Sequence, residues 1–291
     1  MMLRLRRLAL VLASLAALAW SAPAWAEPAL WVARSGQATV YIFGTVHYLR
    51  PDTAWRSPRI EKALGDSRTL VLEVADLQDE SRVQPLLRAY GFDPGHPLSG
   101  KIRPSDEPRL AAAAKAVGLA RPTLEPMQPW LVALTLSVLP ALRAGYDPKS
   151  GVELALTAEA KAAGKPIEAL ETTEQQVRFL ADLPPSAQAQ FLTETLDDVD
   201  DAVGEIDRLV AAWQAGDLGE LEREFVEQTR DRYPEIYRVL VAQRNRAWAE
   251  ALQARMAGGG TSFVAVGAGH LVGPDSLIAE LRRRGIKVER E

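Results

Sequence analysis

Apolar runs of four or five residues occur near both ends of the chain, while the middle carries longer stretches in which apolar residues recur at helical spacing. The first two runs flank the turn signal Ser35-Gly36-Gln37 and predict a β-hairpin. Each later run predicts one further strand. In chain order, the predicted strands cover residues 30–33, 39–43, 69–72, 166–170, 263–266 and 286–289.

Capping and breaking residues divide the rest of the chain into helices. Proline at the first helical position begins one helix at Ser57-Pro58. The apolar stretch from Trp130 to Leu142 is too short for a membrane span and predicts a buried core helix. A capping box is predicted at Thr173-Glu174-Gln175-Gln176. The remaining predicted helices cover residues 151–163, 186–215, 217–229, 235–256 and 274–284, with glycine stops at Gly164, Gly216 and Gly258.

This order of elements predicts an α/β (α+β) fold. Its central mixed sheet is expected to be built from strands at both ends of the chain. A large helical insertion, at about residues 78–260, is expected to cover one side of that sheet.

Residues 1–26 have the features of a signal peptide. Three arginines precede an apolar run, which ends in the small-residue cleavage motif Ala24-Trp25-Ala26. Cleavage after Ala26 leaves residues 27–291, which we expect to form a single domain that is periplasmic or secreted, with no stable membrane insertion. The alternative is that the segment stays uncleaved as a membrane anchor.

Composition and charge narrow the classes of function. The chain has no cysteine, so disulfides and thiolate catalysis are excluded. Loss of the three arginines of the leader takes the formal net charge from −4 to −7. This acidic balance argues against nucleic acid or an anionic membrane as the main partner. The expected partner is therefore a peptide or a small-molecule substrate.

Four predicted strands end close to a side chain that can bind a metal or move a proton: His47, Glu73, Glu171 and His270. The two histidines stand in the same frame, each three residues after a glycine that follows a strand. Strand ends in α/β proteins meet at the edge where binding sites form. We therefore expect the two imidazoles to lie side by side around one pocket.

Two imidazoles and a carboxylate are a common ligand set for a catalytic divalent metal. The predicted metal ligands are His47, His270 and Glu73, and the ion would activate water and polarise a carbonyl. Glu73 and Glu171 are candidate catalytic carboxylates, as general base or as the partner of a histidine. The alternative is structural: a histidine that hydrogen-bonds a loop and a glutamate that caps a helix.

Other residues complete the candidate site. The glycines that open the two histidine frames, Gly44 and Gly267, would let substrate or backbone approach closely. Arg244 is expected to clamp a carboxylate or stabilise an oxyanion, with Asn245 beside it as a substrate contact; alternatively, Arg244 is a partly exposed salt-bridge residue. His96 lies in a turn and is excluded from the site. The aromatic residues expected in the core or along a groove are Tyr41, Trp55 and Trp248.

The chain resembles the TraB/GumN family, which includes the TIKI proteases. The stretches that carry the resemblance are Phe43–His47, Val71–Glu73, Ala169–Thr172 with Gln176 after it, and Arg244-Asn245 followed by Val266–Leu271. The resemblance implies a fold related to that of erythromycin esterase and ChaN-like proteins. It also implies an active site formed by the paired histidines and the strand-end glutamate, with manganese or cobalt as in a metal-dependent peptidase. The candidate ions for this chain are therefore Mn, Co or Zn.

Three hypotheses for function follow. The first is an exported metal-dependent hydrolase, a peptidase, with Arg244 as a substrate or oxyanion contact. The second is a periplasmic binding or accessory protein without catalysis. The third is an esterase-type hydrolase that uses a histidine–glutamate pair without metal. The sequence has no cysteine nucleophile and no G-x-S-x-G elbow, which favours metal activation.

Overall fold

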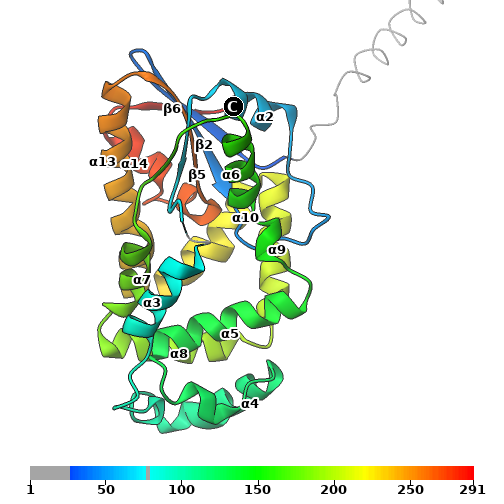
Figure 1. The fold of residues 1–291 in the computed structure, drawn as a ribbon, viewed down its shortest axis with the longest axis vertical. Coiled ribbons are helices and arrows are strands. Elements are labelled where there is room, and N and C mark those ends of the chain that lie inside the picture. The colour runs from blue at the N-terminus through cyan, green and yellow to red at the C-terminus, as the bar shows by residue number, and fades with distance from the viewer. Residues whose placement is uncertain (1–26, 77–78) are drawn as a thin grey trace, which may run out of the picture.

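The computed structural model describes residues 27–76 and 79–291. The predicted signal peptide, residues 1–26, lies outside the described residues. Within them, six strands form a sheet in the order β4-β3-β5-β2-β1-β6 (Figure 1). The strands are β1 (Leu30–Ser35), β2 (Ala38–Thr45), β3 (Thr69–Leu72), β4 (Ile167–Ala169), β5 (Gly260–Gly267) and β6 (Lys287–Arg290).

The sheet is mixed, as predicted. The strands β4, β3, β5 and β2 run parallel to one another, whereas β1 is antiparallel to both β2 and β6. The register pairs Thr45 of β2 with Gly267 of β5, and Leu72 of β3 with Ala265 of β5. Strands from the two ends of the chain are therefore hydrogen-bonded neighbours, and the four parallel strands have their carboxyl ends at the same edge.

Helices fill the rest of the described chain. The longer ones are α2 (Pro58–Asp66), α3 (Glu80–Gly91), α4 (Glu107–Ala116), α5 (Pro129–Arg143), α6 (Val152–Ala162), α7 (Thr173–Ala181), α8 (Pro185–Asp198), α9 (Ala202–Ala215), α13 (Arg244–Ala257) and α14 (Leu277–Arg283). Short α-helical turns are α10 (Leu218–Leu221), α11 (Gln228–Arg232) and α12 (Pro234–Tyr237). The 3-10 turns are η1 (Leu98–Gly100), η2 (Pro104–Asp106), η3 (Arg121–Leu124), η4 (Pro148–Ser150) and η7 (Ala268–Leu271), and the π-helical segments are η5 (Glu222–Glu227) and η6 (Arg238–Gln243).

Helices cover both faces of the sheet, whereas the sequence predicted that the insertion covers one side. Phe43 and Phe263 pack on one face with α2, α6 and α9. Ile42 and Val264 pack on the other face with α13 and α14 (Figure 1). The physical reason is that the central strands β2 and β5 are apolar on both faces, so each face needs a cover. The helix α13, at the end of the insertion, provides part of the second cover.

Local signals set several of the helix boundaries. Ser57 caps α2 by accepting the backbone N–H of Ile60, and Pro58 stands at the first helical position. The capping box of α7 is formed by Thr172 and Gln175, one residue earlier than predicted, because Thr172 is the residue that keeps the extended backbone of an N-cap. The apolar stretch predicted as a core helix is α5, which buries Trp130 and Leu136 among other residues.

The predicted helix 186–215 is wrong as a single element. The structure breaks it into α8 and α9 between Val199 and Asp201. The break lies within a cluster of four aspartates: Asp197, Asp198, Asp200 and Asp201. Aspartate is a poor helix former, and like charges at helical spacing repel one another. The predicted helices 217–229 and 235–256 are present, but each contains a π-helical segment.

No helix within the described ranges has the length and apolar character that crossing a membrane requires.

Candidate active site

The carboxyl ends of the parallel strands bring the predicted side chains together. Glu73 follows the last residue of β3 directly, and His270 lies in the turn η7 after β5. His47 lies two residues after the end of β2, which pairs with β5. Arg244 reaches the same place from the first position of α13, to which the π-helical segment η6 leads.

Arg244 is the centre of a buried ionic network. Its Nη2 atom lies 2.7 Å from Glu73 Oε2 and 2.8 Å from Glu171 Oε2, and its Nε lies 2.9 Å from Glu171 Oε1. The side chains of Arg244, Glu73 and Glu171 are 10%, 8% and 6% exposed. The guanidinium also lies over the ring of Trp248, 4.6 Å from its centroid. A buried guanidinium thus holds two carboxylates that would otherwise repel each other.

Three hydrogen bonds hold Glu73 in this network and occupy three of the four lone-pair sites of its carboxylate. Its Oε1 accepts the backbone N–H of Gly267 at 2.6 Å, and its Oε2 accepts from Arg244 and from the side-chain amide of Gln176 at 3.1 Å. Burial alone would raise the pKa of Glu73, but His270, Arg244, His47 and the Gly267 amide outweigh burial and lower that pKa well below its usual range. Glu73 is therefore a carboxylate at neutral pH.

The hydrogen bonds of His270 define its protonation state. The side-chain amide of Asn245 donates to the carbonyl of Asp275 at 2.8 Å, which leaves Asn245 Oδ1 facing His270 Nδ1, also at 2.8 Å. The proton of His270 is therefore assigned to Nδ1. Its Nε2 lies 3.1 Å from Arg244 Nη1 and must accept, because a guanidinium only donates. Consistently, burial lowers the pKa of His270 to about 3.

His47 has a different environment. Its side chain is 51% exposed, and its Nδ1 lies 2.8 Å from Oε1 of Glu153, near the start of α6. Burial of the ring works against a positive charge, but the Glu153 carboxylate outweighs it and raises the pKa of His47 to about 9. The charge of His47 also lowers the pKa of Glu73 and of His270, so these groups are within electrostatic reach. The two histidines lie at one edge of the sheet, one as an imidazolium and one as a neutral ring.

The other predicted residues have definite places. Glu171 accepts from Arg244 and from Trp248 Nε1, the latter at 2.8 Å. The carbonyl of Gly44 accepts from Trp213 Nε1, and a side chain at this position would contact Ala268 of η7 at 3.1 Å. Gly44 therefore permits close approach of the η7 backbone, whereas a side chain at Gly267 would lie 3.2 Å from Glu73 Oε1. Contact of Gly44, Gly267 and Asn245 with substrate stays a prediction.

Sequence reasoning missed some residues of this cluster and correctly set others aside. Trp248, predicted only as a core or groove aromatic, donates to Glu171 and packs on His270 with ring centroids 4.5 Å apart. Glu153 was not predicted at all, because an acidic residue in the first turn of a helix is ordinary. His96 is an exposed loop residue, paired with Asp93, as expected.

The predicted metal set does not fit a metal as it is arranged here. In the described part of the chain, no three His, Asp or Glu side chains form a group that could hold an ion. The lone pair of His270 Nε2 faces the guanidinium of Arg244, and the oxygens of Glu73 are already hydrogen-bonded. Binding an ion at His270 and Glu73 would require Arg244 to move away. The metal, Mn, Co or Zn, stays a prediction.

Comparison with known proteins identifies the family. The sequence matches the model of the TraB/PrgY/gumN family over residues 29–290. The chain belongs to this family. It is 28% identical over 261 residues to the protein named "Uncharacterized protein YbaP" of Escherichia coli K12, which covers 88% of this chain and 92% of that protein. The same name, identity and coverage apply to a Shigella flexneri protein. No solved structure matches, so the kinship with the erythromycin esterase and ChaN-like folds stays a prediction.

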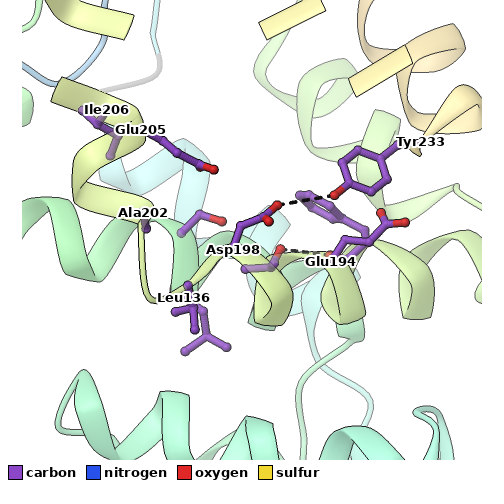
Figure 2. A pocket seen from close by; sticks show the side chains of 11 residues that line it. Leu136, Glu194, Asp198, Ala202, Glu205, Ile206 and Tyr233 are labelled. Atoms are coloured by element: carbon purple, nitrogen blue, oxygen red, sulfur yellow. Dashed lines mark hydrogen bonds between the residues drawn. The ribbon is translucent and has the colours of Figure 1, made fainter. Parts of the chain in front are cut away.

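A separate cavity of about 210 Å³ lies between α5, α8, α9 and Tyr233, and none of the residues of the cluster around Arg244 and the two histidines lines it. Figure 2 shows that Asp198 faces Tyr233, whose hydroxyl donates to it at 3.5 Å. Burial, with repulsion from Asp197 and Asp198, raises the pKa of Glu194 to about 7. This cavity therefore lies in the helical layer, apart from the cluster around Arg244 and His270.

Proposed function

We propose that this member of the TraB/PrgY/gumN family is an exported hydrolase of amide or ester bonds. The observation that supports the proposal is the half-exposed imidazolium of His47, within electrostatic reach of the buried carboxylate of Glu73. A proton donor and a fixed carboxylate at one edge of a sheet are the groups that acid–base hydrolysis needs. The substrate would be a peptide or a small molecule that reaches the periplasm or the exterior.

The reaction can be written with these residues alone. Water attacks the substrate carbonyl carbon while Glu73 orients the water and accepts its proton. The low pKa of Glu73 makes it a weak base, so this transfer is completed only as the new C–O bond forms. His47 gives its Nε2 proton to the leaving nitrogen or oxygen as the bond to carbon breaks. The products are a carboxylic acid and an amine or alcohol. Glu73 then releases its proton to solvent and His47 takes one up, which restores both groups.

The other members of the cluster act through Glu73. Arg244 and Gln176 hold one oxygen of Glu73, and the Gly267 amide holds the other, so the carboxylate has a fixed direction. His270 accepts from Arg244 and in this way fixes the guanidinium. Arg244 also provides a positive charge near the place where an oxyanion would develop.

The test is a screen of peptides and esters with purified residues 27–291, in the presence and absence of a chelator. Turnover that is lost in His47→Ala and kept in His96→Ala supports the proposal, since His96 is the exposed histidine of the loop. Loss of turnover on chelation would instead support the metal-dependent peptidase, for which the ionised Glu73 and neutral His270 have the required protonation states. Tight binding without turnover would support the binding protein.

A further inference from the structure

Glu153 is the partner that the structure gives to His47. Its Oε1 lies 2.8 Å from His47 Nδ1. A glutamate side chain is ordinarily ionised at neutral pH, and a carboxylate can only accept a hydrogen bond. The proton between the two groups therefore belongs to His47 Nδ1.

The carboxylate is itself held from the sheet. Thr45, the last residue of β2, donates its hydroxyl to the same Oε1 of Glu153. Thr45 is 2% exposed and pairs with Gly267, whose amide binds Glu73. The end of β2 thus determines where the carboxylate lies, and the carboxylate determines where the imidazole lies.

The main chain fixes the distance between the helix and the histidine. The N–H of Val152, the first residue of α6, donates to the carbonyl of Val46 at 3.1 Å. Just before it, Gly151 approaches the carbonyl of His47 so closely that an added Cβ would lie 2.4 Å from that oxygen. Since this contact is with backbone, the start of α6 and the His47 loop form one unit.

We propose that Glu153 is the positioning residue of His47. It accepts the Nδ1 proton and fixes the ring plane, so that Nε2 is left to meet the substrate. None of the residues that the structure describes hydrogen-bonds to this Nε2, and the ring is half-exposed. The role of Nε2 as a proton donor to substrate rests on the proposed function. The hydrogen bond between His47 and Glu153 can be tested without any substrate.

The chain has only three histidines, so their ring signals can be resolved by NMR on protein labelled with ¹⁵N-histidine. We expect two hydrogen-bonded Nδ1–H signals, one from His270 and one from His47, and the signal of His47 is the one that is lost in His47→Asn. It should disappear in Glu153→Ala and remain in Glu159→Ala, a control that removes an exposed carboxylate from the same helix. The signals of His270, which has its own partners, should not change in either variant and report that the fold is intact.

The proposal is overturned if the wild type lacks the Nδ1–H signal of His47, or if Glu153→Ala keeps it while the His270 signals are unchanged. If Glu153→Ala does not fold, Thr45→Val is the second variant. It removes the hydroxyl that holds Glu153, and the exchange of the His47 Nδ1–H should become faster. Unchanged exchange in Thr45→Val would then overturn the proposal.

Failure of this inference and failure of the proposed function are distinguishable. With a substrate in hand, turnover by Glu153→Ala should fall about 10–100-fold, the range for loss of a residue that orients a functional histidine. A protein that shows the NMR signal but hydrolyses nothing would contradict the function and leave the positioning role intact. A protein that needs His47 for turnover but not Glu153 would contradict the positioning role alone.

Discussion

Arg244 and His270 meet through a contact of 3.1 Å between guanidinium Nη1 and imidazole Nε2. The lone pair on Nε2 is the one that a metal ion would use, and here an internal cation faces it. The same guanidinium holds Glu73 and Glu171. Arg244 would therefore have to move before an ion could bind to His270 Nε2 and Glu73, and the metal stays a prediction.

Removal of Arg244 should be costly and should change the chemistry of the site. Arg244→Ala leaves two buried carboxylates without a cation, and we expect the free energy of unfolding to fall by about 3–5 kcal/mol. It also frees His270 Nε2 and Glu73, so the variant should bind Zn²⁺ or Mn²⁺ more tightly than the wild type. Urea unfolding and isothermal titration calorimetry measure the two effects.

The matched control is Arg238→Ala, one and a half helical turns earlier. Arg238 is 49% exposed and pairs with Glu235 of α12, so its loss should change stability far less than the loss of Arg244. If Arg244→Ala and Arg238→Ala lower the free energy of unfolding equally, the Arg244 network contributes no more to stability than an ordinary surface ion pair.

Gly269, which directly precedes His270, lets the ring of Phe225 pack closely against the backbone. A Cβ built on Gly269 would lie 2.1 Å from the ring of Phe225, which belongs to the π-helical segment η5. We expect Gly269→Ala to destabilise the protein by about 1–3 kcal/mol through overpacking. Gly65→Ala is the control, because its Cβ would meet nothing within 4 Å inside α2, and alanine in a helix should stabilise. Thermal unfolding of both variants decides the point, and a neutral Gly269→Ala would contradict it.

The buried carboxyl of Glu194 should give a stability change with pH. Its pKa is raised from 4.5 to about 7 in the folded protein. The folded state then binds the proton more strongly than the unfolded state, so stability falls as the pH rises from 4.5 to about 7. Glu194→Gln should remove this contribution and be more stable relative to the wild type at pH 8 than at pH 4. A difference between the two proteins that does not vary with pH, in urea unfolding, would contradict the assignment.

The sequence predicted much of the fold because its signals are local. An apolar run followed by a polar side chain marks the end of a strand, and the strands that precede Glu73 and the two histidines were found in this way. The meeting of those strand ends followed from the geometry of α/β sheets. The family resemblance contributed the match at Arg244, which periodicity alone did not distinguish from a surface arginine.

What was missed depends on tertiary contacts. In the sequence, Glu153 is an ordinary acidic residue in the first turn of a helix. Its role depends on its contacts with Thr45 and His47, which are distant in the sequence. Trp248 looks like any core aromatic, although its N–H binds Glu171. The π-helical segment before Arg244 has no signature in the sequence, since it arises from how the helix packs. The metal, predicted from residue types, stays a prediction; those residue types do not reveal that the guanidinium of Arg244 lies beside His270 and Glu73.

The decisive measurement is the initial rate of hydrolysis by purified residues 27–291 after exhaustive treatment with a chelator, with bound metal determined by mass spectrometry on the same sample. We predict a rate within about twofold of the untreated protein and a metal content far below one ion per chain, because Arg244 supplies the positive charge at Glu73 and His270. A rate that is lost on chelation and returns with added Mn²⁺, Co²⁺ or Zn²⁺ would contradict the claim that this site hydrolyses its substrate without a metal ion.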